Sequence, residues 1–402
     1  MMEERKVPAL RFQGFTDEWE ENKLGEMTVF SKGSGYSKSD LQDHGTPIVL
    51  YGRLYTNYET LISHIDTFAE PKSGSVYSQG VEVIVPASGE TAEDISRASV
   101  IGRKGVIIGG DLNILYPNKL LDPVFLAITI SNGKAHDDMA KRAQGKTVVH
   151  LHNDDLAQIK LFYPSISEQK QIGVFFQKID VDILLLKNKL DKLQVFKKSM
   201  LEKMFPRPCE KVPEVRFRGF TGDWEKKKLG SIFEEYSEKN HAELPPLMIV
   251  QGGGTILRDE SDRSLQYDRS NLSSYKMVNK DDFIVHLRSF EGGLEKASSQ
   301  GIISPAYHTF HGEGIDARFY YAYFRSAVFI RHDLKPHVYG IRDGRSIDIE
   351  GMKSILIPYT SYEEQKKIGD CISLLDQLIM LCQRKLEKLQ SLKHAMLSEM
   401  FI

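Results

Sequence analysis

Two stretches of the chain place apolar residues at the seven-residue spacing of a coiled-coil helix. Each begins with a similar hexapeptide, EQKQIG at 168–173 and EQKKIG at 364–369, and ends with Met-Phe. A second apolar position follows four residues later in each heptad, and Lys197 and Lys393 interrupt the two stripes at the same register. Core helices of an ordinary globular domain are the alternative, but five heptads favour a coiled coil. The predicted interface residues are Ile172, Ile179, Leu186, Leu193, Met200, Ile368, Leu375, Leu389 and Met396.

A second pair of matching segments shows that the chain contains one internal duplication. Residues 7–25 and 212–230 are identical at 12 of 19 positions, and both tryptophans, Trp19 and Trp224, are among them. Self-similarity of this kind indicates repeated structural units. Each unit has a leading segment, a divergent globular region and a helix, in that order.

The short connection between the units predicts how the two helices pack. Only Pro206–Lys211 separate the first helix from the second leading segment, so the second globular region must lie at the C-terminal end of that helix. If the helices pack together, the second runs back toward the first globular region. The expected result is an antiparallel pair about 55 Å long, at about 1.5 Å per residue, with one globular domain at each end.

The globular regions are expected to be α+β. Strand-like runs at 81–85 and 105–108 have counterparts at 282–285 and 301–303, and helix starts at Asp122 and Asp316 follow them. The predicted domains are 1–164 (leading segment and first globular region), 165–205 (first helix), 206–361 (linker, leading segment and second globular region) and 362–402 (second helix).

Composition narrows the function classes. The hydrophobic share of 41% predicts an ordered protein, and we expect a cytoplasmic one because no apolar run approaches a membrane span or signal peptide. Three scattered cysteines fit a reducing compartment and form no metal-binding spacing. The 53 basic and 55 acidic residues argue against a protein that grips nucleic acid through bulk basicity.

Motifs for catalysis are incomplete. Ser304–Tyr307 (SPAY) and Asp122–Phe125 (DPVF) faintly resemble the motif with which amino-methyltransferases hold the target amine, but each lacks its second proline. The glycine clusters at 33–35 and 252–254 do not form a phosphate-binding loop. His308 and His311 have no further ligands at metal spacing. We therefore expect no catalytic residue and no metal site in this chain.

Basic, amide and aromatic residues in glycine-punctuated loops remain as candidates for contact with DNA. Arginine and lysine pair with guanine edges or phosphates, glutamine pairs with adenine, and hydroxyl groups bind phosphate oxygens. In the first region these candidates are Lys32, Ser34, Tyr36, Lys38, Tyr51, Arg53, Tyr55, Lys141, Arg142, Gln144, Lys146 and Thr147. In the second they are Arg288, Ser289, Tyr307, His308, Tyr339, Arg342, Arg345 and Ser346. Each patch alone is more often a solvated face.

The duplicated segments resemble the DNA-specificity (S) subunits of type I restriction-modification systems over the whole chain. The similarity rests on the repeated VPxxRFxGFT…WE segments at Val7 and Val212 and on the helix starts at Glu168 and Glu364. The loops at 33–41 and 287–293 are also similar to those of two kinds of target-recognition domain. The resemblance implies an α+β fold with two pseudo-twofold-related target-recognition domains separated by a long antiparallel two-helix coiled coil.

The resemblance also implies the partners and the division of chemistry. The partners are double-stranded DNA, two methyltransferase (M) subunits and restriction (R) subunits, with no membrane. S-adenosylmethionine, ATP and Mg are expected on the partner subunits, with no cofactor on this chain. Each recognition domain would read one half of a bipartite asymmetric site with an unread gap. The alternatives are a two-headed protein-interaction scaffold and a stand-alone DNA methyltransferase.

The charge of the globular regions refines this expectation. Residues 29–160 contain 13 basic and 15 acidic residues, and residues 240–345 contain 13 of each. Because affinity for DNA grows with the number of phosphates neutralised, the isolated chain should bind DNA weakly. Much of the phosphate contact would then come from partner subunits.

Overall fold

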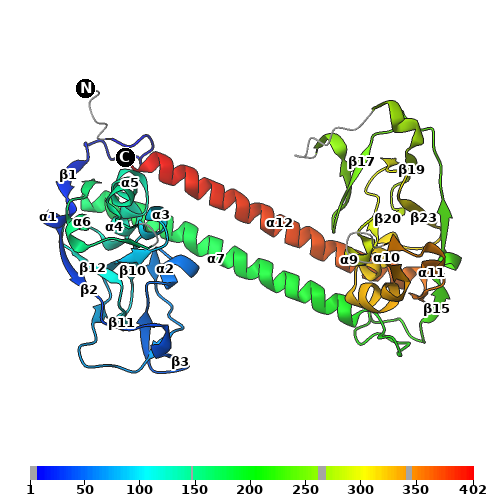
Figure 1. Cartoon of the computed structure of the whole chain (residues 1–402), viewed down its shortest axis with the longest axis horizontal. Helices are drawn as coiled ribbons and strands as arrows, with labels where there is room; N and C mark the ends of the chain where they lie inside the picture. The colour runs from blue at the N-terminus through cyan, green and yellow to red at the C-terminus, as the bar shows by residue number, and fades with distance from the viewer. Residues whose placement is uncertain (1–6, 146–147, 261–268, 341–345) are drawn as a thin grey trace. The chain divides into compact units, whose positions relative to one another are not determined.

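The computed structural model describes residues 7–145, 148–260, 269–340 and 346–402, which fall into two compact units. Unit 1 consists of Met1–Lys187 and Arg384–Ile402, and unit 2 of Asn188–Gln383. Each unit contains a globular region of mixed helices and strands together with part of two long helices (Figure 1). The α+β fold predicted from the sequence is confirmed.

The two long helices are α7 (Ile166–Lys203) and α12 (Tyr362–Met400). In unit 1 they run antiparallel, because Asp180 of α7 pairs with Lys393 of α12 while Phe176, one turn earlier, meets Phe401 beyond the end of α12. In unit 2, Lys197 pairs with Asp376 in the same sense. The two ion pairs are related by the same offset of 196 residues, so the duplication repeats this contact.

The predicted interface residues of both helices are buried or partly buried. Ile172, Ile179, Ile368 and Leu375 are buried. The remaining predicted interface residues are partly buried, and they are Leu186, Leu193, Met200, Leu389 and Met396. Lys197 and Lys393, which interrupt the two apolar stripes, each form an ion pair with an aspartate of the other helix.

The globular region of unit 1 is built around two five-stranded sheets, in the orders β2-β12-β8-β10-β5 and β3-β6-β4-β11-β7. In Figure 1 the second sheet lies at the end of the unit away from the chain termini. Strands β1 and β14, and β9 and β13, form two further pairs. The strands are β1 (Glu20–Lys23), β2 (Thr28–Lys32), β3 (Leu41–Gln42), β4 (Thr46–Val49), β5 (Leu61–Ile62), β6 (Phe68–Ala69), β7 (Tyr77–Gln79), β8 (Val83–Pro86), β9 (Ser88–Gly89), β10 (Ser99–Ile101), β11 (Lys104–Ile108), β12 (Leu112–Pro117), β13 (Val149–His150) and β14 (Lys160–Tyr163). The shorter helices are α1 (Leu24–Met27), η1 (Lys38–Asp40), α2 (Arg53–Thr56), α3 (Ala92–Ile95), α4 (Pro123–Ile130), α5 (Gly133–Arg142) and α6 (Asn153–Ala157).

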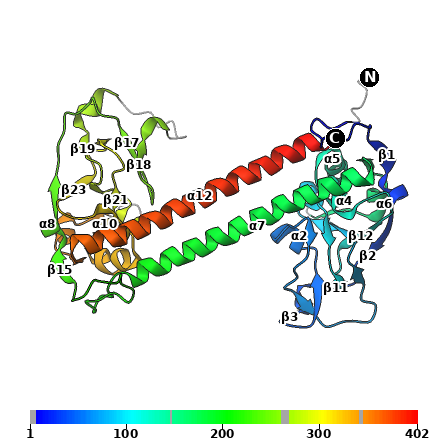
Figure 2. The same cartoon turned by 180° about the vertical axis from the view of Figure 1, so that it is seen from behind.

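Unit 2 repeats the central part of this topology and differs elsewhere. The pairings β2-β12-β8 and β1-β14 of unit 1 correspond to β16-β23-β20 and β15-β26 of unit 2. In place of the second five-stranded sheet, unit 2 has the short pairs β17-β18 and β19-β22 (Figure 2). Its strands are β15 (Glu225–Lys228), β16 (Phe233–Tyr236), β17 (Leu247–Val250), β18 (Gly254–Leu257), β19 (Lys276–Val278), β20 (Phe283–Val285), β21 (Glu295–Lys296), β22 (Gly301–Ile303), β23 (His308–Gly312), β24 (Val338–Tyr339), β25 (Ser346–Ile347) and β26 (Leu356–Tyr359). Its helices are α8 (Leu229–Ile232), η2 (Arg258–Glu260), η3 (Arg269–Ser274), α9 (Ser289–Gly292), α10 (Ala317–Phe324), η4 (Phe329–Leu334), η5 (Lys335–His337) and α11 (Ile349–Lys353).

The repeated segments make the same contacts in both units. Arg11 donates two hydrogen bonds to Glu168, at 2.6 and 2.7 Å, and Arg216 donates two to Glu364, at 2.7 and 2.9 Å. Each leading segment is therefore clamped onto the start of a long helix by a bidentate ion pair. The glutamates are buried, so these pairs are less screened by water than surface pairs.

The predicted helix starts at Asp122 and Asp316 are confirmed as N-caps. The Asp122 carboxylate accepts hydrogen bonds from the backbone N–H groups of Val124 and Phe125, and Asp316 caps α10 in the same way. The side chain of Gln169 accepts from the backbone of Asp122, at 2.9 Å, which ties α4 to α7. Asp122 thus has a structural role, which accounts for the partial likeness of its neighbourhood to a methyltransferase motif.

The glycine of each hexapeptide lies where a long helix meets a capped helix. A methyl group at Gly369 would lie 2.8 Å from Asp316 Oδ1, whereas one at Gly173 would lie 3.4 Å from Val124. Gly369→Ala is therefore expected to destabilise unit 2 by about 1–3 kcal/mol through overpacking. Gly173→Ala is expected to be neutral or to stabilise unit 1 by up to about 1 kcal/mol through helix propensity. Urea unfolding of the two variants measures the difference, and equal losses would contradict this assignment.

Candidate nucleic-acid interface

In unit 1 two candidate loops lie side by side at the end of β11. Ser34 N–H donates to Ile108 O at 2.9 Å, and Gly109 N–H donates to Val49 O at 2.9 Å, so β11 holds the loop at 33–38 beside the turn at 50–53. The approach at Gly33 is close enough that a Cβ there would lie 1.8 Å from Gly109 O, and only glycine fits. The local chain path therefore brings the loop that follows Lys32 and the turn that begins near Tyr51 together at the end of β11.

Some candidates of unit 1 are exposed, and others hold the loops in place. Tyr36 is buried, and its hydroxyl accepts the N–H of Lys72 at 2.7 Å. Arg53 is paired with Glu59 at 2.7 Å and with Asp66 at 3.0 Å. The phenol of Tyr55 donates to Ser88 O, and burial raises its pKa far above the usual value. These three side chains support the loops from within.

The remaining candidates of unit 1 also divide into side chains with internal partners and side chains that are exposed. Ser34 accepts the N–H of Val76, at 3.2 Å, and Arg142 pairs with Asp138 at 3.2 Å. Lys146 and Thr147 lie outside the described residues. The exposed candidates, whose side chains form no ion pair among the described residues, are Lys32, Lys38, Tyr51, Lys141 and Gln144.

In unit 2 three candidate segments far apart in sequence converge around one small cavity. The cavity has a volume of about 60 Å³, and its lining includes His286, Leu287, His308 and Ser346. Arg288 and Tyr339 are exposed beside these segments, and Tyr339 is the strand partner of Ser346. The fold therefore assembles one surface of mixed polar and apolar residues from positions up to about sixty apart, which no local pattern could show.

Three other candidates of unit 2 have internal contacts, and two are not described. Ser289 is buried and accepts the N–H of His286 at 2.9 Å, and His308 Nδ1 lies 2.8 Å from Glu235. The ring of Tyr307 packs edge-on against His286, with 6.2 Å between centroids. Arg342 and Arg345 fall outside the described residues.

His286 and Leu287 are not among the candidates predicted from the sequence, although the loop at 287–293 is. Leu287 is 68% exposed, an unusual position for leucine, and His286 Nε2 has no hydrogen-bond partner in the described part of the chain. Burial lowers the pKa of His286, so its ring is neutral near pH 7. The sequence signal that could have identified them is their place beside Arg288 in a glycine-terminated turn.

The described residues contain no group of three or more histidine, cysteine or acidic side chains arranged to hold a metal ion. None of the helices in the described part of the chain combines the length and apolarity of a membrane span. Ser304–Tyr307 forms a turn closed by the N–H of Tyr307 and the carbonyl of Ser304, at 3.1 Å.

Residues 16–195 match the type I restriction modification DNA specificity domain. The resemblance to the specificity subunits of type I restriction-modification systems that was drawn from the sequence is thus confirmed. Among curated proteins, the type I restriction enzyme MjaVIII specificity subunit of Methanocaldococcus jannaschii is 21% identical, over 94% of this chain and 90% of that protein. The putative MjaX specificity subunit of the same organism is 24% identical, over 71% of this chain and 69% of that protein.

A solved structure shares the fold. The type I restriction-modification S subunit from M. genitalium superposes with a TM-score of 0.61 at 14% identity, covering 98% of this chain and 99% of that one. The similarity extends over both units and both long helices, well beyond the segment that matches the domain family.

Proposed function

We propose that this chain selects the DNA sequence on which a type I restriction-modification complex acts, and that each unit reads one half of a bipartite site. The observation that carries this proposal is the contrast within the duplication. The Arg–Glu clamps, the aspartate caps and the helix–helix ion pairs are repeated, while the loops and outer sheets differ. One scaffold carrying two different surfaces is suited to an asymmetric target.

The proposed readers are the exposed polar residues at each surface. In unit 1 these include Lys32, Lys38 and Tyr51, and in unit 2 Arg288 and the surface around Ser346. Arginine and lysine would contact guanine edges or phosphates, and the exposed Leu287 would contact a thymine methyl group. The spacing of the two half-sites would follow from the length of α7 and α12.

We further propose that two methyltransferase subunits and the restriction subunits carry the chemistry, with S-adenosylmethionine, ATP and Mg bound there. Exposed apolar pairs on the long helices support two equivalent docking positions. Leu184 and Leu185 are 51% and 60% exposed in unit 1, and Met380 and Leu381, 196 residues later, are 48% and 51% exposed in unit 2. Exposed apolar patches on a helix are typical of protein interfaces.

Methylome sequencing tests the proposal. Cells that contain the partner subunits, with and without this chain, are compared for methylated adenines. A bipartite motif that is present only with the chain is the expected result. Methylation that does not depend on the chain would contradict the proposal, and purified chain that methylates DNA alone would show it to be an enzyme.

The isolated chain is expected to bind its own target weakly, with a Kd of about 1 µM or weaker at physiological salt. Two arginines of the globular regions are already neutralised, Arg53 by two carboxylates and Arg325 by Glu295. Added methyltransferase subunits should tighten binding and steepen its dependence on salt. Fluorescence anisotropy over a salt series measures both, and tight, strongly salt-dependent binding by the chain alone would refute this prediction.

A further inference from the structure

A polar link in unit 1 connects the first globular region to the pair of long helices. Asp180 of α7 accepts a hydrogen bond from the hydroxyl of Thr60, at 3.2 Å, and pairs with Lys393 of α12. Thr60 is buried, and its carbonyl accepts the N–H of Val100 in β10, at 2.8 Å. Thr60 is fixed by the sheet and Asp180 by the helix pair. Their hydrogen bond therefore sets the distance between the sheet and the helix pair.

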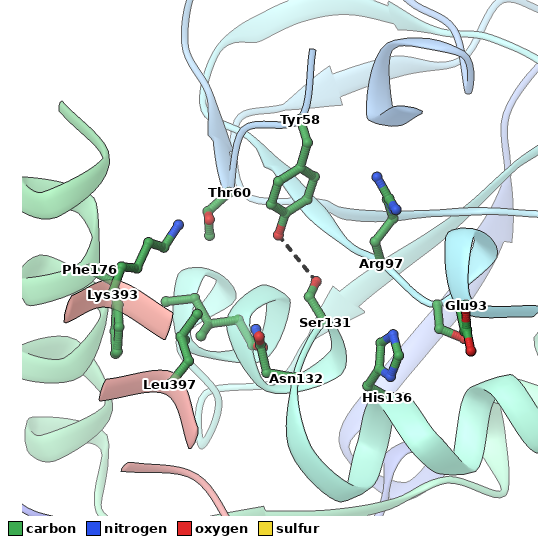
Figure 3. A pocket seen from close by; sticks show the side chains of 12 residues that line it. Tyr58, Thr60, Glu93, Arg97, Ser131, Asn132, His136, Phe176, Lys393 and Leu397 are labelled. Carbon is green, nitrogen blue, oxygen red and sulfur yellow. Dashed lines mark hydrogen bonds between the residues drawn. The ribbon is translucent and has the colours of Figure 1, made fainter. Parts of the chain in front are cut away.

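The packing around this link is incomplete. A cavity of about 250 Å³ adjoins it, with Tyr58, Thr60, Ser131, Phe176, Lys393 and Leu397 among its lining residues. In Figure 3 the ammonium group of Lys393 points toward Thr60, and Tyr58 turns its hydroxyl to Ser131. Apolar side chains do not fill the space at this point, so the polar link acts here beside the apolar packing of Phe176, Ile179 and Phe401 that joins the globular region to the helices elsewhere.

Unit 2 has the same helix–helix ion pair without this link. Asp376 pairs with Lys197, and no hydrogen bond to Asp376 from the second globular region occurs among the described residues. Instead, Arg318 of α10 pairs with Asp370, at 2.5 Å, nearer the start of α12. The duplication therefore retains the ion pair in both units but joins the globular regions to the helices differently.

We propose that the Thr60–Asp180–Lys393 link is a positioning element that fixes the first recognition domain on the helix pair and so restricts the gap between the half-sites to one length. This inference rests on the proposed function. Thr60 is assigned no contact with DNA. Loosening the link should let the first domain settle in more than one orientation, which relaxes the gap while leaving the bases of each half-site unchanged.

The test uses the full complex with methyltransferase subunits and a plasmid library in which the gap varies one base pair at a time. Thr60→Val removes the hydroxyl at constant shape, and Lys393→Met removes the charge that orients Asp180. Both should raise methylation at gaps one base pair from the preferred length by about fivefold relative to the wild type, the effect of losing one hydrogen bond. Thr60→Ser, which keeps the hydroxyl, should restore the wild-type gap.

Lys197→Met is the matched control, because it breaks the equivalent ion pair where no link is attached. It should retain the wild-type gap. Unchanged gaps in both Thr60→Val and Lys393→Met, or altered half-site bases, would overturn the inference. If Thr60→Val fails to fold, Lys393→Met decides it, and an unchanged gap in that variant would overturn the inference. Absence of any bipartite motif in the wild-type complex would instead contradict the proposed function.

Discussion

Phe401→Ala is expected to destabilise unit 1 by about 3–5 kcal/mol, the usual cost of removing a buried phenylalanine. The ring is 7% exposed and meets three aromatic rings at centroid distances of 5.9–6.3 Å, those of Trp19, Phe125 and Phe176. The end of the chain thus completes the core of the unit that contains its beginning. Urea unfolding followed by tryptophan fluorescence measures the loss.

The chain supplies its own control for this experiment. Phe205 makes the equivalent contacts in unit 2, with Trp224, Phe319 and Tyr323. Each unit holds one of the two tryptophans, so a Trp224→Phe background reports on unit 1 alone and a Trp19→Phe background on unit 2 alone. Phe401→Ala should mainly lower the Trp19 transition and Phe205→Ala the Trp224 transition. The reverse pattern would rule out the assigned packing.

Glu364→Ala is expected to cost unit 2 about 3–5 kcal/mol, the range for removing one partner of a buried ion pair. Glu364 is 1% exposed and accepts hydrogen bonds from Arg216, from the indole N–H of Trp224 at 3.1 Å and from Thr360. All three donors would lose their acceptor at once. Urea unfolding of this variant is read from the Trp224 signal in the Trp19→Phe background.

Glu168→Ala is the matched variant, and its effect should be smaller. Glu168 accepts from Arg11, whereas Trp19 Nε1 has no hydrogen-bond partner among the described residues. Glu364 thus accepts a hydrogen bond from the indole N–H of Trp224 in unit 2, whereas Glu168 accepts none from the indole N–H of Trp19 in unit 1. An equal or larger loss for Glu168→Ala would show that the Trp224 hydrogen bond contributes little.

The scaffold could be predicted because its signals are periodic or repeated. Heptad spacing identified the buried stripes of α7 and α12, and an aspartate before an apolar run identified both N-caps. The pairing of Arg11 with Glu168 was not predicted, although both residues lie in repeated motifs. They are 157 positions apart, and a sequence gives no sign of which distant charges meet.

The candidate surface could be described from the sequence only in part. Composition of the loops identified candidate regions, but it could not separate exposed side chains from those that support the loops. Arg53 resembles a DNA contact until the fold places Glu59 and Asp66 around it, and Ser289 resembles one until its hydroxyl is seen to hold the His286 turn.

Insertion of one heptad into both α7 and α12 tests the central claim, that the helices set the distance between two half-sites read by the two units. Seven residues add about 10 Å at about 1.5 Å each, which corresponds to about three base pairs. Methylome sequencing of cells carrying the lengthened chain with its partners should show both half-sites unchanged and a gap longer by about three base pairs. A motif with the original gap would contradict the account.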